Sequence, residues 1–402
     1  AILILSMLTL YLPVVANADN GSRLDENIAW TLDDDRGILT IGGTGDFRTL
    51  TSPFINNINI KSVVIENGVT GIGFIFEGCS NLTDITISDS VDLIDVSFKG
   101  CSSLKNIIVS ENNKNFCSIN GNLFSKDKTK LLRYAPGKSD TSYTIPDDVT
   151  DIESKAFANC GNLTDIKMPN SITDIGSSAF DSCTGLTRIS IPDSVTNIWY
   201  RAFSGCSNLT DITIPDSVTT IDSLAFAECV SLTDITIPDS VTEMNESVFS
   251  DCSSLKNISV GEGNKNYCSI DGNLFNKNKT KLLKYAAGKT NTDYTIPNGV
   301  TNIGESAFSH CENLTSIIIP DSVTDIGKSA FYGCKGLTSI ILPNGITEIN
   351  AYTFSNCHSL TNVKIPDSVT RIGSFAFSSC HSLKSIVIPK NVTIADSSGV
   401  FQ

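Results

Sequence analysis

A period of 23 residues runs through most of the chain and restricts its possible folds more than any other feature. The repeated segment is clearest at 209–221, which reads LTDITIPDSVTTI. Two series of cysteines keep the spacing: Cys160, Cys183, Cys206, Cys229 and Cys252, then Cys311, Cys334, Cys357 and Cys380. Units of this length bury their apolar faces only against neighbouring units, so the period predicts a solenoid. A solenoid offers a long surface for function in place of a single cleft.

Each unit contains two apolar segments separated by a turn. Leu209, Ile212 and Ile214 show the alternation of a half-buried strand. The following Pro-Asp-Ser favours a turn, and Val218 and Ile221 form the second segment. The next residues, around the Ala-Phe pair, have helical spacing, so we expect one short helical turn there. In a parallel stack, each strand pairs with its copy one unit away at ~4.8 Å.

The composition limits both partners and location. The chain of 402 residues has 43 acidic and 29 basic residues and a net charge of −14. Such a charge disfavours nucleic acid and anionic membranes, so we predict no nucleic-acid partner. Residues 1–18 are largely apolar and end in Ala16-Asn17-Ala18, as in a secretion signal. A transmembrane helix is the alternative, but the run is short for one. We predict an exported chain without a membrane span in its mature part.

The thirteen cysteines are expected to be free thiols. Eleven lie at one repeat phase, so stacking places them in a column where their side chains are parallel instead of convergent. We therefore predict a ladder of buried thiols that act as small apolar groups. The paired C-x-x-C spacing of metal sites does not occur, so we predict no metal and no cofactor.

The repeat pattern L-x-x-I-x-I-P-x-x-V-x-x-I-x-x-x-A-F-x-x-C-x-x-L resembles the BspA-like leucine-rich repeat family, and extends from Leu82 to Ile388 with few breaks. The resemblance implies a β-rich right-handed superhelix with parallel strands and short helical turns. It also implies a secreted or cell-surface protein that adheres to matrix proteins or to other cells.

Two insertions and both ends depart from the repeat. The insertions, at about 113–145 and 264–296, are near copies offset by 151 residues, and their Asn120-Gly121 and Asp271-Gly272 pairs predict tight hairpins. Residues 19–60 lack the repeat, and we expect them to cap the end of a solenoid that covers 61–402. The sequence stops within a repeat, from which we expect a C-terminal truncation.

Residues with catalytic or metal-binding potential are few. No G-x-S-x-G, H-E-x-x-H or phosphate-binding glycine motif is present, so we predict no enzymatic activity. His358 and His381 are 23 residues apart and should stack, either as variable turn residues or as a weak metal site. Five aspartates follow proline at one turn phase: Asp193, Asp216, Asp239, Asp321 and Asp367. They fit turn capping better than calcium binding, which needs six or more converging oxygens.

The exposed strand positions are the first candidate binding surface. These positions lie between buried residues and should form one outward-facing row, namely Asp165, Arg188, Asp211, Asp234 and Asn257. A neighbouring row is rich in threonine, and no aromatic cluster marks a carbohydrate platform on this face. The alternative is a solubilising face without a ligand.

The second candidate is the basic charge of the two insertions. The first contains Lys126, Lys128, Lys130 and Arg133, and the second contains Lys277, Lys279, Lys281 and Lys284. These residues would contact acidic glycans or proteins, or they would protect hairpin edges from strand addition.

These features together predict a non-catalytic interaction protein that is exported or displayed on a cell surface. We expect its partners to be host matrix or cell-surface proteins or glycans. One alternative is a structural spacer that displays another domain. Another is a hydrolase of surface polymers, for which paired acids such as Asp211 and Asp234 are the only candidates.

Overall fold

The protein folds as a β-solenoid, seen in a computed structural model that describes residues 27–48, 52–95, 98–395 and 399–401. The predicted secretion signal lies outside the described residues. The chain divides into two compact units, one ending at Lys138 and the other beginning at Ser139. Parallel pairing between successive turns dominates both units, as the period predicts.

The first unit begins with an antiparallel hairpin of β1 (Ile28–Asp33) and β2 (Ile38–Gly43). Strands β4 (Ser62–Ile65), β6 (Asp84–Ile87) and β8 (Asn106–Val109) then add in parallel to β2. A second row consists of β3 (Gly45–Phe47), β5 (Val69–Ile72) and β7 (Leu93–Ile94). The hairpin therefore occupies the edge of the parallel sheet, while the assignment of 19–60 as a cap stays a prediction.

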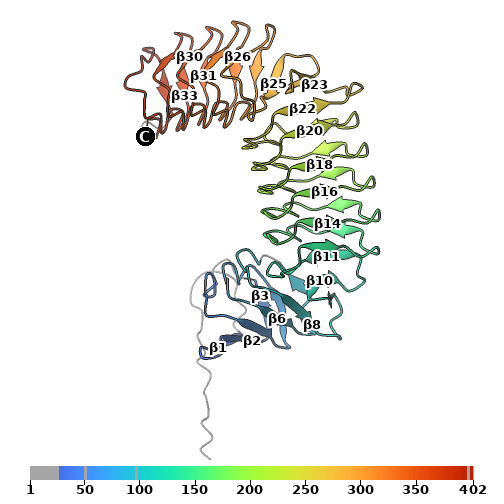
Figure 1. Ribbon diagram of the computed structural model, residues 1–402. Coiled ribbons are helices and arrows are strands. Elements are labelled where there is room, and N and C mark those ends of the chain that lie inside the picture. Colours follow the sequence, from blue (N-terminus) through green and yellow to red (C-terminus); the bar gives the residue numbers. More distant parts are fainter. Residues whose placement is uncertain (1–26, 49–51, 96–97, 396–398, 402) are drawn as a thin grey trace, which may run out of the picture. The chain divides into compact units, whose positions relative to one another are not determined.

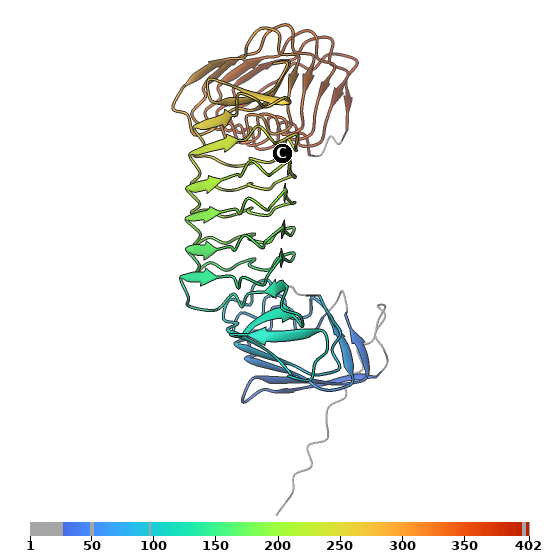
Figure 2. The ribbon, with the colours of Figure 1, turned by 90° about the vertical axis from the view of Figure 1, so that its right-hand side faces the viewer.

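The second unit has a row of longer strands and a row of two-residue strands. The longer strands are β12 (Ser142–Thr144), β14 (Asp165–Lys167), β16 (Arg188–Ser190), β18 (Asp211–Thr213), β20 (Asp234–Ile237), β22 (Asn257–Val260), β26 (Asp293–Thr295), β28 (Ser316–Ile318), β30 (Ser339–Ile341) and β32 (Asn362–Lys364). The short strands are β13 (Asp151–Ile152), β15 (Asp174–Ile175), β17 (Asn197–Ile198), β19 (Thr220–Ile221), β21 (Glu243–Met244), β27 (Asn302–Ile303), β29 (Asp325–Ile326), β31 (Glu348–Ile349), β33 (Arg371–Ile372) and β34 (Thr393–Ile394). Figure 2 shows the longer strands of the green turns in one row.

The predicted hairpins are present in both insertions. Strands β9 (Phe116–Ile119) and β10 (Asn122–Ser125) pair around Asn120-Gly121, and β11 (Lys130–Arg133) pairs with β10. In the second copy, β23 (Tyr267–Ile270), β24 (Asn273–Asn276) and β25 (Lys281–Lys284) repeat this arrangement around Asp271-Gly272. Both central residues of each turn have positive φ, between 48° and 74°, as a tight hairpin turn requires.

Aromatic and thiol columns form the core. The rings of Phe157, Phe180 and Phe203 stack with centroids 5.1 Å apart. All thirteen cysteines are free thiols, and ten of the eleven at the repeat phase are buried. Most thiols of the column also donate to the carbonyl of a phenylalanine in the preceding turn, as in Cys183 Sγ to Phe157 O at 3.0 Å. The predicted thiol ladder is confirmed, and these hydrogen bonds explain why cysteine is used where alanine would also fit.

The predicted short helical turn is wrong: the described residues contain no helix. The segment between the short strand and the cysteine consists of consecutive turns, with Ala179 N bonded to Gly176 O and Cys183 N to Phe180 O. Ser178 and Ser182 have φ of 57° and 59°, which breaks a helix. Ser178, Phe180 and Ser182 instead donate their amides to carbonyls of the next turn. Pairing between turns replaces pairing along a helix.

The positive φ of Glu228 predicts that a glycine at this position would stabilise the protein. This exposed residue has φ of 58°, while Gly205 occupies the same position in the preceding turn with φ of 70°. Glycine removes roughly 1–2 kcal/mol of backbone strain from the folded state. It also makes the unfolded chain more flexible, which costs about 0.5–1 kcal/mol of stability. Glu228→Gly should therefore raise the free energy of unfolding by about 0.5–1 kcal/mol in thermal or urea denaturation. Glu228→Ala, which keeps the strain, should give no gain; an equal gain would contradict this explanation.

Candidate functional site

The predicted surface row is formed by the first residues of five successive longer strands (Figure 1). Arg188 lies opposite Asp211, and Asp234 lies opposite Asn257, in parallel register. Arg188, Asp211 and Asp234 are exposed, whereas Asp165 and Asn257 are half-buried. Arg188 Nε lies 3.8 Å from Asp165 Oδ1, so it compensates the charge at that end of the row. The uncompensated acidity begins at Asp211.

The neighbouring threonine row contributes to the stack. Thr187 Oγ1 donates to Thr164 O at 3.3 Å, Thr210 Oγ1 to Thr187 O at 3.1 Å and Thr338 Oγ1 to Thr315 O at 3.1 Å. These hydroxyls bond successive turns to each other. The row therefore has a structural role, which leaves the charged row as the more specific binding feature.

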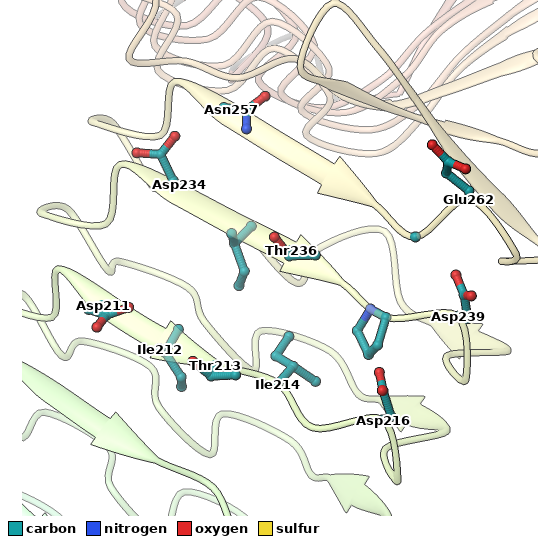
Figure 3. A pocket seen from close by; sticks show the side chains of 13 residues that line it. Asp211, Ile212, Thr213, Ile214, Asp216, Asp234, Thr236, Asp239, Asn257 and Glu262 are labelled. Carbon is teal, nitrogen blue, oxygen red and sulfur yellow. The ribbon is translucent and has the colours of Figure 1, made fainter.

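A hollow of about 480 Å³ lies on the strand face and includes three of the predicted residues, Asp211, Asp234 and Asn257. Figure 3 shows Asp211 and Asp234 at the start of their strands and Asp216, Asp239 and Glu262 beyond the strand ends. Thr213, Thr236 and edges of buried isoleucines lie between these two acidic groups. The thirteen residues that line the hollow include five carboxylates and no lysine or arginine.

The hollow coincides with a break in the sheet. Strands β16 and β18 form one sheet and β20 and β22 another, so β18 and β20 are not ladder neighbours. On the short-strand side, β17, β19 and β21 pair without interruption. The row of longer strands is interrupted in the same way between β14 and β16, so the interruption alone does not mark the hollow.

A glycine pair shapes one end of the hollow. A Cβ on Gly261 would lie 2.0 Å from Asp239 Oδ1, and one on Gly263 would lie 2.4 Å from Asp239 Oδ2. Only glycine permits this close approach, which holds the Asp239 carboxylate against the loop before Asn264. The signal in the sequence is Gly261-Glu262-Gly263 in place of Pro-Asp-Ser, a departure that the repeat pattern alone did not single out.

The insertions provide a weaker basic surface than predicted. Arg133 and Lys284 are 1% and 2% exposed, so their assignment to a binding surface was wrong. Lys284 Nζ donates to Ser306 O and Ser309 Oγ, both at 2.9 Å, and burial lowers the pKa of this amine. In strand β25 it lies on the same face as buried Leu282, which period-two alternation explains.

The other insertion lysines are at the surface, and the partners of Lys126 and Lys281 lie within the chain. Lys126 Nζ donates to Glu111 O at 2.9 Å, and half-buried Lys281 forms an ion pair with Glu246. Lys128, Lys130, Lys277 and Lys279 are exposed. They stay candidates for contact with acidic partners.

The histidines do not converge with carboxylates into a metal site. His358 and His381 stack as predicted, with ring centroids 5.1 Å apart. His310 Nε2 lies 3.1 Å from Asp251 Oδ1, and this hydrogen bond lowers the pKa of the Asp251 carboxyl. Across the described ranges, no group of three or more His, Cys, Asp or Glu residues is arranged to hold a metal ion.

Comparisons with known proteins agree with this geometry. A family model described as a BspA type leucine-rich repeat region matches residues 51–136, 137–256, 173–293 and 285–402. A search of curated proteins found no match. In the part of the chain that the structure describes, no helix has the length and apolar character of a membrane span.

Two solved structures resemble the chain along most of its length. A leucine-rich cell surface protein from Faecalibacterium prausnitzii is 28% identical, with a TM-score of 0.56, and the match covers 96% of this chain and 99% of that protein. The pneumococcal vaccine antigen PcpA is 23% identical, with a TM-score of 0.61, and the match covers 91% of this chain and 80% of that one. The second comparison supports the fold alone.

Proposed function

The chain belongs to the BspA-type leucine-rich repeat family, and on this premise we propose that it is a cell-surface or secreted protein that mediates adhesion through protein binding. The similar Faecalibacterium prausnitzii protein, described as a cell surface protein, supports this location. The acidic hollow is the observation that favours a binding surface over a purely structural spacer, because a spacer needs no group of five carboxylates around one hollow.

We assign the main contact to the strand face around Asp211, Asp234 and Asn257. Five carboxylates line its hollow, so the partner that fits best presents lysine or arginine side chains. Complementary charge raises the association rate and selects partners, while many modest contacts along the face supply affinity. The exposed insertion lysines are the second candidate, since Arg133 and Lys284 are buried and Lys126 and Lys281 are engaged within the chain.

Charge reversal in the hollow tests this assignment. Asp211→Lys/Asp234→Lys should weaken binding of an immobilised basic probe, such as a polylysine peptide or a cationic matrix protein, at least tenfold in 50 mM salt. The loss should shrink above 0.5 M salt, because added ions screen the attraction. Surface plasmon resonance with the full chain measures both effects.

The matched control is Asp293→Lys/Asp325→Lys, which makes the same charge change on β26 and β29, away from the hollow. Equal weakening by both variants would show that net charge alone drives binding and would refute the site. If the unmodified chain binds none of a panel of basic peptides and matrix proteins, the spacer function would replace the adhesion proposal.

A further inference from the structure

The turn after β17 carries two consecutive exposed aromatic residues. Trp199 is 36% exposed and Tyr200 is 43% exposed. Both lie on the short-strand side of the second unit, and neither lines the acidic hollow. The strand face lacks an aromatic cluster, so this pair is a separate surface feature.

The repeated turns show that packing does not require an aromatic residue here. Seven residues before the column cysteine, the other turns of the unit have small or polar residues: Glu153, Gly176, Asp222, Asn245, Gly304, Gly327, Asn350 and Gly373. A Cβ on Gly176, Gly327 or Gly373 would lie 2.5–2.6 Å from a backbone nitrogen of the preceding turn. The stack accepts glycine or a short polar residue where Trp199 stands, so packing between turns does not itself call for a tryptophan.

Contacts with neighbouring turns hold the aromatic pair in place. Trp199 Nε1 donates to Asp174 Oδ1 at 2.7 Å, and Arg201 Nη2 lies 3.0 Å from Asp181 Oδ1. The Tyr200 carbonyl accepts from Ser178 N at 2.8 Å. The segment is therefore ordered before any ligand arrives, which lowers the entropic cost of binding.

The surroundings of the rings are polar and rich in hydrogen-bond acceptors. Exposed Asp174 comes from β15, and Asn197 lies beside it in β17, since Ile175 and Ile198 are paired in register. Asp174 also pairs in register with half-buried Asp151 of β13. An aromatic face edged by carboxylates and an amide matches a pyranose, which has an apolar C–H face and a rim of hydroxyl donors. The carboxylates would repel an anionic sugar.

We infer that Trp199, Tyr200, Asp174 and Asn197 form a binding subsite for a neutral glycan. The partly exposed ring of Trp199 stacks on a pyranose, while its N–H stays bonded to Asp174. The second carboxylate oxygen of Asp174 accepts a hydrogen bond from a sugar hydroxyl. The side-chain amide of Asn197 both donates to and accepts from sugar hydroxyls. Each contact is weak, so binding gains from repeated sugars on a polymer or surface.

Tryptophan fluorescence provides a direct assay, because the chain has only two tryptophans, Trp30 and Trp199. Trp30→Phe leaves Trp199 as the sole reporter and keeps an aromatic ring against Phe54, whose centroid lies 5.1 Å from that of Trp30. Titration of this full-length variant with neutral cello-, malto-, xylo- and chito-oligosaccharides should give a saturable change in emission with at least one of them. The same sugar should bind the unmodified chain in calorimetry.

The preceding turn supplies the matched variant. Trp199→Gly/Tyr200→Ser recreates Gly176-Ser177, so thermal unfolding should be unchanged while affinity for the oligosaccharide falls at least tenfold. Asp211→Lys/Asp234→Lys should bind the sugar normally, which separates this site from the strand face. Absence of binding across a broad array of neutral glycans, retained binding in the Gly/Ser variant, or selective binding of proline-rich peptides at these rings would overturn the inference.

Discussion

Raising the pH from 8 to 10.5 is expected to unfold the protein. The cause is the thiol column, because burial raises the pKa of each cysteine that it desolvates. The pKa is about 11 for Cys380 and about 12 for Cys252, and it lies well above the ordinary value of 9.0 for Cys206, Cys229 and Cys334. The folded chain keeps these protons at a pH where the unfolded chain has lost them.

The sign of the effect follows from this difference. A raised folded-state pKa contributes stability that is present below pH 9 and is lost as the pH rises through the window from 9 to about 12. Each such thiol costs roughly 1.4 kcal/mol per pH unit above 9. Five of them therefore cost about 7 kcal/mol at pH 10, which is comparable to a typical free energy of unfolding of about 5–15 kcal/mol. Lys284 and Lys289 act in the opposite direction, since burial lowers the pKa of each amine, but two amines do not offset five thiols.

Circular dichroism melts between pH 7 and 10.5, with a reductant present, measure the loss of stability. Thiolate absorbance near 240 nm should appear together with unfolding and not before it. Cys206→Ala/Cys229→Ala should lose less free energy of unfolding between pH 7 and pH 10 than the unmodified chain loses, because two of the titrating groups are gone. A melting temperature that stays constant from pH 8 to 10.5 would show that the thiols are not protected as the structure requires.

The parts of the fold that follow from strict repetition were predictable from the sequence. Stacked copies of one segment must place like residues in rows, so Cys183 and Cys206, or His358 and His381, had to be neighbours. The short helix was mispredicted because the spacing of Ala and Phe ignores backbone φ. Ser178 and Ser182 have left-handed conformations that no propensity of serine indicates.

The candidate site shows the limit of the same reasoning. Asp211-Ile212-Thr213 and Asp234-Ile235-Thr236 are identical, so their sequence cannot reveal that their strands are not ladder neighbours. The burial of Lys284 could have been predicted from the sequence, since alternation in the KLLK strand places it on the same face as Leu282. The prediction missed it because it considered only the number of basic residues in the insertion. The most specific sequence signals of a candidate site were departures from the repeat, such as Trp199 and Gly261, because the stacking of turns does not require these residues.

Another departure from the repeat, Asn264, is expected to cause a large loss of stability when its side chain is removed. Asn264 is fully buried at the start of the second insertion. Its Nδ2 donates to Pro238 O at 2.8 Å and Val241 O at 3.0 Å, and its Oδ1 accepts from Asn266 N at 2.9 Å and Tyr267 N at 2.8 Å. One side chain thus satisfies four backbone groups of two successive turns. Asn113 makes equivalent bonds in the first insertion, which indicates that both inserts depend on this contact.

Asn264→Ala should lower the free energy of unfolding by about 3–5 kcal/mol. Each buried backbone group left without a partner costs roughly 1–3 kcal/mol, and water entering the small space left by the amide recovers part of the total. The control is Asn313→Ala, which removes a single exposed bond from Nδ2 to Lys289 O and should cost under about 1 kcal/mol. Urea denaturation compares the two variants, and hydrogen exchange should show faster exchange over 264–296 in Asn264→Ala. Equal losses in the two variants would mean that the insertion is held by its hairpin strands, and that the buried amide contributes no more than a surface contact.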